Sequence, residues 1–360
     1  MRKMSVRVEQ WPLHEPFVIS RMAPMLHGEV VVVEIEQDGC VGRGECERMD
    51  IFEPDYPFDV LADVQSAVAA VEGGISRDAL RDLLPSGAPR NAIDCALFEL
   101  EAKLQQQPAW QMAGFDAAPH PVTTVFTLSL DSAENMGRAA AAQKHRPILK
   151  LKLGRSGDLE RVRAVRAAAP DTRLVIDANT GWSFAQLCDY LPELAKLGVE
   201  MVEQPLAFEE EHLLETITPV LPITADESCI DRTSLAALKG RYQAVNIKLD
   251  KTGGMTEALA LLKEAQAMGF EVMVGCMIGT SLAMARHFCW RSKRAGWTST
   301  GLYCCPKIAL PRSTTVTVWW NRAKACGAEA DCLPRCDCLL FPLSHGIRHG
   351  FFVVADEFSP

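Results

Sequence analysis

Five charged residues follow short apolar runs at nearly constant spacing. They are Lys152, Asp177, Glu203, Asp226 and Lys248, and successive members lie 25, 26, 23 and 22 residues apart. Three carboxylates flanked by two amines could hold a cation and move protons. The regular spacing indicates a structural repeat in which each unit delivers one side chain to a common place.

The three carboxylates are Asp177 in VIDANTGW, Glu203 in MVEQPL and Asp226 in ITADES. Oxygen ligands of this kind suit a hard divalent cation, most simply one Mg²⁺ per chain, with the remaining positions left to water and substrate. A single carboxylate in such a place more often caps a helix or pairs with a lysine. Three of them at the repeat period favour a metal site.

The lysines extend this chemistry to proton transfer. LKLKLG places Lys150 and Lys152 on one face of a strand, although a solvated amphipathic strand would show the same alternation. Lys248 lies four units later, so Lys152 and Lys248 would face each other across a ring of eight units. Two such bases can remove a proton from one face of a carbon and return one to the other, through a metal-stabilised enediolate. The predicted reaction is racemisation or epimerisation by 1,1-proton transfer.

The repeat itself predicts the elements that position these groups. From about residue 121, seven strand-like runs alternate with Ala- and Leu-rich stretches of helix length. This pattern predicts an α/β fold, a (β/α)-barrel or modified TIM barrel over residues 116–285, with its chemistry at the carboxyl ends of the strands.

The sequence of residues 1–115 predicts an α+β capping domain. Its strand-rich part contains a hairpin that turns at Asp38 and Gly39, and helices are expected around residues 57–73 and 90–106.

The composition disfavours some classes of binding partner. Of the 360 residues 48% are hydrophobic, and the net charge of -9 disfavours nucleic acid and anionic membranes. No apolar run approaches the length of a membrane span, and the first residues lack the apolar core of a signal peptide, so a cytoplasmic location is expected. The oligomeric state, monomer or homo-oligomer, stays open.

KLKLG, VIDANTGW, MVEQPL, ITADES and NIKLDKTGG, in this order and spacing, resemble the muconate-lactonising branch of the enolase superfamily, and within it the dipeptide epimerases. The resemblance covers residues 1 to about 285. It implies that the three carboxylates bind Mg²⁺ and that Lys152 and Lys248 are the acid/base pair. It also implies that Lys150 helps to hold the substrate carboxylate and that residues 1–115 close over the pocket.

The same resemblance implies a dipeptide substrate such as L-Ala-L-Glu or L-Ala-D-Glu, as in recycling of cell-wall peptide. Arg21 in VISRMAPMLHG is placed like the cation that binds the distal carboxylate of the substrate, although a solvated loop arginine would look alike. Thr127 in FTLSL, and Cys276 and Ile278 in GCMIGTSLAMA, resemble the substrate-binding pattern at the first and seventh strands. The Asp-x-Asp motif of the eighth strand, which in these epimerases binds the ammonium group of the dipeptide, is missing.

The last 75 residues differ in composition from the rest. They hold seven of the thirteen cysteines and four of the seven tryptophans, and the helix–strand rhythm stops after Met284. Joining the third base of each codon to the first two bases of the next gives another sequence. The junction of Trp297 and Thr298 must then encode Asp, and the residues up to Cys305 permit DLDGPLLL, which contains the missing motif. The sequence therefore predicts that residues 286–360 are an out-of-frame tail and that the eighth strand is lost.

Other reactions are compatible with the same site residues. An N-acylamino acid racemase, an o-succinylbenzoate synthase or a cycloisomerase of this branch would use the same carboxylates and lysines. The offset DLDGP favours the dipeptide epimerase, because the substrates of those other relatives have no ammonium group for this motif to bind. A catalytically inactive metal-binding barrel, or an unstable frameshifted product, is the alternative outside the enzymes.

Overall fold

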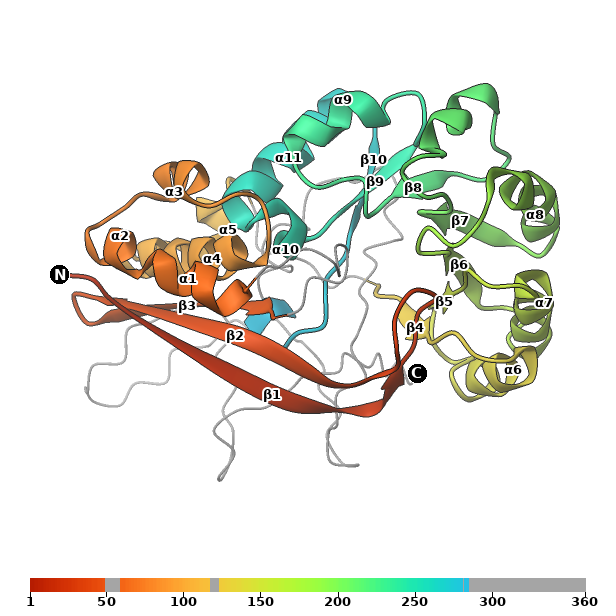
Figure 1. Ribbon diagram of the computed structural model, residues 1–360, viewed down its shortest axis with the longest axis horizontal. Helices are drawn as coiled ribbons and strands as arrows, with labels where there is room; N and C mark the ends of the chain where they lie inside the picture. The colour runs from red at the N-terminus through yellow and green to blue at the C-terminus, as the bar shows by residue number, and fades with distance from the viewer. Residues whose placement is uncertain (49–58, 117–122, 281, 285–360) are drawn as a thin grey trace.

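The computed structural model describes residues 1–48, 59–116, 123–280 and 282–284. The segment that the codon junctions predict to be out of frame, residues 286–360, lies outside this range. Figure 1 shows two parts, a three-stranded sheet covered by helices and a curled sheet of seven strands.

The three-stranded sheet is antiparallel. It consists of β1 (Lys3–Phe17), β2 (Met25–Gln37) and β3 (Cys40–Glu47). Asp38 and Gly39 connect β2 to β3 with positive φ angles of 51° and 76°. A two-residue turn with both φ angles positive matches the twist of a hairpin, so the predicted hairpin is confirmed.

Five helices follow this sheet; the first four share a hydrophobic cluster with it, whereas the fifth packs into the cluster of the curled sheet. They are α1 (Val60–Ser66), α2 (Val68–Glu72), α3 (Arg77–Leu83), α4 (Ala88–Leu104) and α5 (Ala109–Met112). The helix expected over 57–73 is therefore two short helices in its described part, while the second expected helix is α4. A Cβ on Gly44 would lie 1.9 Å from the carbonyl oxygen of Ala92, so glycine lets β3 approach α4 closely.

The larger sheet is parallel, and its strands follow each other in sequence order from one edge to the other. They are β4 (Phe126–Leu128), β5 (Ile148–Lys152), β6 (Arg173–Asp177), β7 (Val199–Glu203), β8 (Ile223–Ala225), β9 (Ala244–Ile247) and β10 (Glu271–Val274). The seven predicted strand units are confirmed, and in the described part of the chain the sheet ends at β4 and β10.

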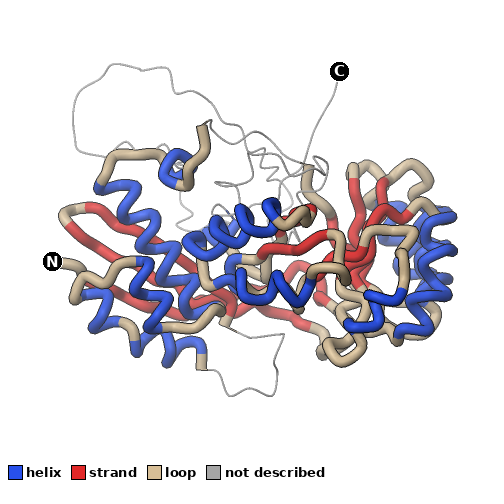
Figure 2. Tube along the Cα trace, turned by 90° about the horizontal axis from the view of Figure 1, so that it is seen from above, coloured by secondary structure: helices blue, strands red, loops and turns tan. Residues whose placement is uncertain are grey.

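Helical segments follow each of the first six strands. They are α6 (Ala133–Ala142), α7 (Asp158–Ala168), α8 (Phe184–Lys196), η1 (Glu211–Thr216), η2 (Arg232–Ser234), α9 (Leu235–Leu238), α10 (Leu249–Thr252) and α11 (Met255–Ala267). Figures 1 and 2 show α6, α7 and α8 on the outer face of the curled sheet. No helix in the described ranges is long and apolar enough to cross a membrane.

Strand β5 shows how the core positions the site. Leu149, Leu151 and Leu153 belong to the main hydrophobic cluster between sheet and helices. The intervening Lys150 and Lys152 are only 1% and 5% exposed. The alternative interpretation of LKLKLG as a solvated amphipathic strand is therefore wrong, because both faces of β5 are buried. Placing two amines there requires buried partners of opposite charge.

The segment after β1 attaches the smaller part to the larger one. The backbone N–H of Leu130, after β4, donates to the Val18 carbonyl at 3.1 Å. A Cβ on Gly154 would lie 2.8 Å from Ser20 Oγ, so the segment also lies against the end of β5. These contacts bring Arg21 to the carboxyl end of the parallel sheet.

Candidate metal and proton-transfer site

Five neighbouring strands each deliver one charged group to the carboxyl end of the parallel sheet. In sheet order these groups are Lys152 on β5, Asp177 on β6, Glu203 on β7, Asp226 directly after β8 and Lys248 directly after β9. The strand register pairs Lys152 with Asp177, and Asp177 with Glu203. The carboxylates form the middle of this row, and a lysine stands at each end.

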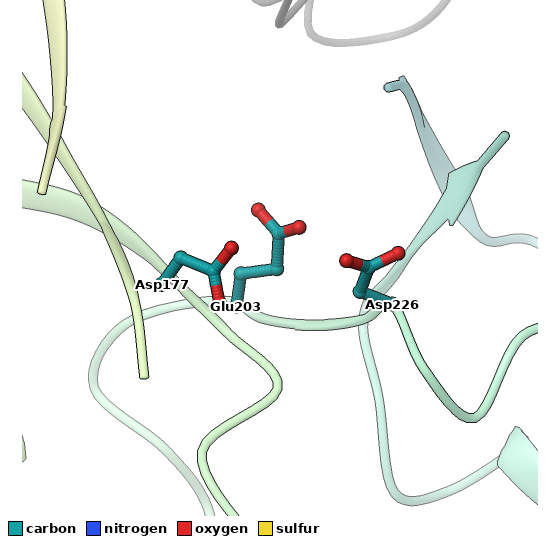
Figure 3. Close-up of side chains that lie close together, drawn as sticks. All are labelled: Asp177, Glu203 and Asp226. Carbon is teal, nitrogen blue, oxygen red and sulfur yellow. The ribbon is translucent and has the colours of Figure 1, made fainter. Parts of the chain in front are cut away.

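The three carboxylates converge (Figure 3). Asp177, Glu203 and Asp226 are each 0% exposed, and they offer oxygen atoms that all lie within 4.8 Å of one another. Three buried anions at this separation repel one another strongly, so the cluster requires cations.

On the β5 side, two lysines supply positive charge. Lys152 Nζ lies 2.6 Å from Asp177 Oδ2, and Lys150 Nζ lies 2.6 Å from Glu203 Oε2 and 2.9 Å from Asp177 Oδ2. Burial would raise the pKa of Asp177, but Lys150 and Lys152 outweigh it and lower the pKa to about 2. Burial and the neighbouring Asp177 raise the pKa of Glu203 to about 7, against the effect of Lys150. The central carboxylate is thus the least compensated.

On the β9 side, Asp226 has two lysine partners. Lys248 Nζ lies 2.6 Å from Asp226 Oδ2, and Lys251 Nζ lies 2.7 Å from Asp226 Oδ1. Burial would raise the pKa of Asp226, but the two lysines hold it well below its usual value. Burial would likewise lower the pKa of Lys248, but Asp226 and Glu203 raise it above its ordinary value.

This donor set fits a hard divalent cation. The side chains offer carboxylate oxygen only, they converge from three adjacent strands, and their central member lacks full compensation by the lysines. Mg²⁺ prefers such oxygen ligands and a few carboxylates. Asp177, Glu203 and Asp226 could therefore hold Mg²⁺, as the sequence predicted.

Arg21 reaches the same end of the sheet and is held by an ion pair. Its Nη2 lies 2.8 Å from Oε1 of Glu227, the residue that follows Asp226 in the sequence. The Glu227 side chain is fully buried, whereas that of Arg21 is 29% exposed. The arginine thus enters the site from the cap, and its role toward substrate stays a prediction.

Three further predicted substrate residues lie around the site. Thr127 on β4 is buried and pairs in register with Lys150. Cys276, after β10, is buried, and Ile278 is half-buried. A Cβ on Gly28 of β2 would lie 2.8 Å from Ile278 Cγ2, which places Ile278 where the cap meets the barrel. Contact of these residues with substrate stays a prediction.

Several residues at the site were not predicted from the sequence, among them Glu227, the partner of Arg21. Asn179 accepts from Lys152 Nζ at 3.0 Å, and Gln204 Oε1 accepts from the Asp226 N–H at 2.8 Å. Lys251 is the second partner of Asp226. Asn179, Gln204 and Lys251 lie within the motifs VIDANTGW, MVEQPL and NIKLDKTGG. The repeat marks one charged residue at each strand end, and it does not mark the amides or the second cation beside these residues.

Comparison with known proteins decides the family. Residues 131–306 match the family model described as enolase C-terminal domain-like, and residues 1–114 match the mandelate racemase / muconate lactonizing enzyme N-terminal domain. The chain is 46% identical over 287 residues to the L-Ala-D/L-Glu epimerase of Escherichia coli (strain K12), an overlap of 79% of this chain and 88% of the relative. The chain belongs to the enolase superfamily.

Solved structures of enolase-superfamily proteins share its fold. An enolase family member from Agrobacterium tumefaciens with homology to dipeptide epimerases, solved with sodium and L-Ala-L-Glu, is 38% identical with a TM-score of 0.79, covering 87% of this chain and 94% of that chain. The Enterococcus faecalis V583 dipeptide epimerase, solved with Mg and L-Leu-L-Tyr, is 28% identical with a TM-score of 0.75, covering 84% of this chain and 89% of that chain. The predicted enolase-superfamily barrel with an N-terminal cap is confirmed.

Proposed function

We propose that this chain is a Mg²⁺-dependent dipeptide epimerase, an isomerase that inverts the α-carbon of the second residue of a dipeptide such as L-Ala-L-Glu or L-Ala-D-Glu. The observation that carries the proposal is the row of groups at the sheet end, in which Lys152 and Lys248 flank three buried carboxylates on opposite sides. The likeness to an L-Ala-D/L-Glu epimerase supports this choice of substrate.

Asp177, Glu203 and Asp226 would hold the Mg²⁺. When bound, the ion supplies a Lewis acid that stabilises the negative charge developing on a substrate carboxylate as the α-proton leaves. Lys150, 2.6 Å from Glu203, adds a fixed positive charge beside the ligands and helps to hold that carboxylate.

Lys152 and Lys248 move the protons. Nζ of one lysine takes the α-proton, and the electron pair of the broken C–H bond passes into the substrate carboxylate. Nζ of the other lysine then delivers a proton to the opposite face of the carbon. Because three strands, β6, β7 and β8, lie between the strands that carry the two lysines, each lysine addresses one face.

Arg21 would bind the side-chain carboxylate of the substrate's second residue. A guanidinium has five N–H donors, and the ion pair with Glu227 engages only one edge of it. Thr127, Cys276 and Ile278 would contact the remainder of the dipeptide from β4, from the chain after β10 and from the cap boundary.

The test is solvent exchange. The protein is incubated with Mg²⁺ and L-Ala-L-Glu in deuterated water, and proton NMR follows the α-carbon of the second residue. We expect deuterium at that carbon together with L-Ala-D-Glu. Exchange confined to N-acylamino acids would assign the N-acylamino acid racemase alternative instead, and no exchange with any substrate would assign the inactive barrel.

We also propose that residues 286–360 are translated out of frame, so two chains should be assayed. One is the 360-residue chain, and the other is translated in the offset frame after about Met284. Exchange by the offset chain alone supports both proposals. Equal exchange by both chains contradicts the frame proposal, and exchange by neither contradicts the epimerase.

A further inference from the structure

We propose that Asn179 is a positioning residue for Lys152 alone, and that Glu227 holds the Asn179 amide in the orientation this requires. The inference rests on the proposed function, because it assigns a role in one half of the epimerisation. It concerns a neutral side chain that lies between the proton-transfer group and the ion pair with the cap.

The contacts leave the amide one orientation. Lys152 Nζ donates to Asn179 Oδ1 at 3.0 Å, and Asn179 Nδ2 donates to Glu227 Oε1 at 3.1 Å. The oxygen of the amide thus faces the lysine donor, and its nitrogen faces the carboxyl oxygen of Glu227. All three side chains are buried. Water is therefore a poor competitor for these bonds.

The backbone fixes the same residue. Asn179 has a φ angle of 45°, and its N–H donates to Asp177 Oδ1 at 3.0 Å. Asparagine is one of the few residues other than glycine that adopts this left-handed conformation readily. Thr180 follows with a φ of 62°, and its N–H donates to the Gln204 carbonyl at 2.7 Å. The turn after β6 thus holds the Asn179 side chain between β5 and Glu227.

Asn179 offers Lys152 a partner of a different kind from Asp177. Asp177 Oδ2, 2.6 Å from Lys152 Nζ, belongs to a carboxylate that is also a predicted metal ligand. The Asn179 oxygen belongs to a side chain outside the three predicted metal ligands, so it can direct Nζ by hydrogen bonding without sharing its oxygen with the ion.

The effect should be confined to one side of the site. Asn179 follows β6, which neighbours β5, whereas Lys248 follows β9, three strands from β6. Arg21, 2.8 Å from the same Glu227 oxygen, connects this arrangement to the cap. Losing Asn179 should therefore disturb proton transfer at the face that Lys152 addresses and leave the other face unaffected.

The experiment measures the two faces separately. Deuterium exchange at the α-carbon is started from L-Ala-L-Glu and from L-Ala-D-Glu, in the chain that exchanges in the assay above, and Lys152→Ala identifies the epimer that depends on Lys152. Asn179→Gly removes the amide while glycine keeps the left-handed backbone. We expect exchange from that epimer to fall about 100-fold, because small misplacements of a reacting group cost this much. Exchange from the other epimer should be unchanged.

Thr180→Gly is the matched control, since it removes a side chain at the adjacent left-handed position, and it should leave both rates unchanged. Asn179→Ala is the second variant and should give the same one-sided loss. Equal slowing of both epimers, or slowing of neither, overturns the inference while leaving the epimerase proposal intact. No exchange from either epimer in the unsubstituted chain contradicts the proposed function itself.

Discussion

The two lysines of LKLKLG differ in what they contact. Lys150 contacts Asp177 and Glu203, while Lys152 contacts Asp177 and the neutral amide of Asn179. Lys150 is thus placed between two of the predicted metal ligands, which suits binding a substrate carboxylate beside the ion. Lys152 stands at the end of the row, which suits a group that must reach the substrate carbon.

Replacing either proton-transfer lysine should abolish epimerisation. For Lys152→Ala and Lys248→Ala we expect the epimerisation rate to fall about 10²- to 10⁴-fold, the range that a positioned acid or base contributes. Each variant should still exchange the α-proton of the one epimer that the remaining lysine addresses. The NMR exchange assay checks this, with the exposed Lys263→Ala as control. Equal rates for Lys152→Ala and the control would contradict the role of Lys152.

Gln204 should govern metal affinity through Asp226. Its Oε1 accepts from the Asp226 N–H at 2.8 Å, and its Nε2 donates to Glu211 Oε1 at 2.6 Å. Gln204→Met removes both bonds, and we expect the Mn²⁺ dissociation constant to rise about 10- to 100-fold, as for other residues that orient metal ligands. Electron paramagnetic resonance of free Mn²⁺ measures this.

The control for Gln204 is Gln243, whose hydrogen bond is made at the other end of β8. Gln243 Oε1 accepts from the Ile223 N–H at 2.9 Å, at the start of β8 rather than at its end. Gln243→Met should leave Mn²⁺ binding unchanged. Equal affinity of the Gln204→Met and Gln243→Met variants would show that Gln204 does not position the ligand.

Among the elements, β3 and the chain after β10 form a partly buried polar contact between cap and barrel. The backbone N–H of Thr280 donates to Glu45 Oε1 at 2.5 Å, and the Thr280 hydroxyl donates to Glu45 Oε2. Burial raises the pKa of Glu45 from 4.5 to about 7, although both hydrogen bonds from Thr280 lower it. Between these two pH values the folded chain holds a proton that the unfolded chain has lost.

Glu45 should therefore make stability fall as the pH rises. Its contribution is fully present below about pH 4.5 and is lost as the pH passes about 7, a difference of up to about 3 kcal/mol in the free energy of unfolding. Glu45→Gln stays neutral, so urea denaturation from pH 5 to 8 should show a smaller decline than in the unsubstituted chain. Parallel curves for the two chains would contradict the raised pKa.

The elements differ in how far the sequence predicts them. The seven parallel strands and the Asp38–Gly39 turn follow from apolar runs and turn residues, which act locally. The carboxylates follow as well, because parallel strands end at one edge. The Asn179 and Gln204 contacts do not, because they depend on left-handed turns and on distances between loops of neighbouring units.

For the whole molecule, the open edges of the parallel sheet should affect solubility and thermal stability most. In the described ranges β4 and β10 are edges, and closed barrels avoid edges because unpaired strands favour aggregation. We predict that the gene encodes DLDGP in the offset frame and that the offset chain is more soluble and unfolds at a higher temperature. Sequencing the gene and comparing thermal unfolding of the two chains check this. A continuous gene without DLDGP in that frame would contradict it.

The central claim is that two lysines on opposite sides of one metal site exchange protons with a single carbon. The most direct test is the isotopic content of the first product formed from L-Ala-L-Glu in deuterated water with Mg²⁺, read by mass spectrometry at low conversion. Two bases predict that essentially every L-Ala-D-Glu molecule carries deuterium at the inverted carbon, because the proton delivered comes from the other lysine. Early product that keeps its original protium would contradict the account.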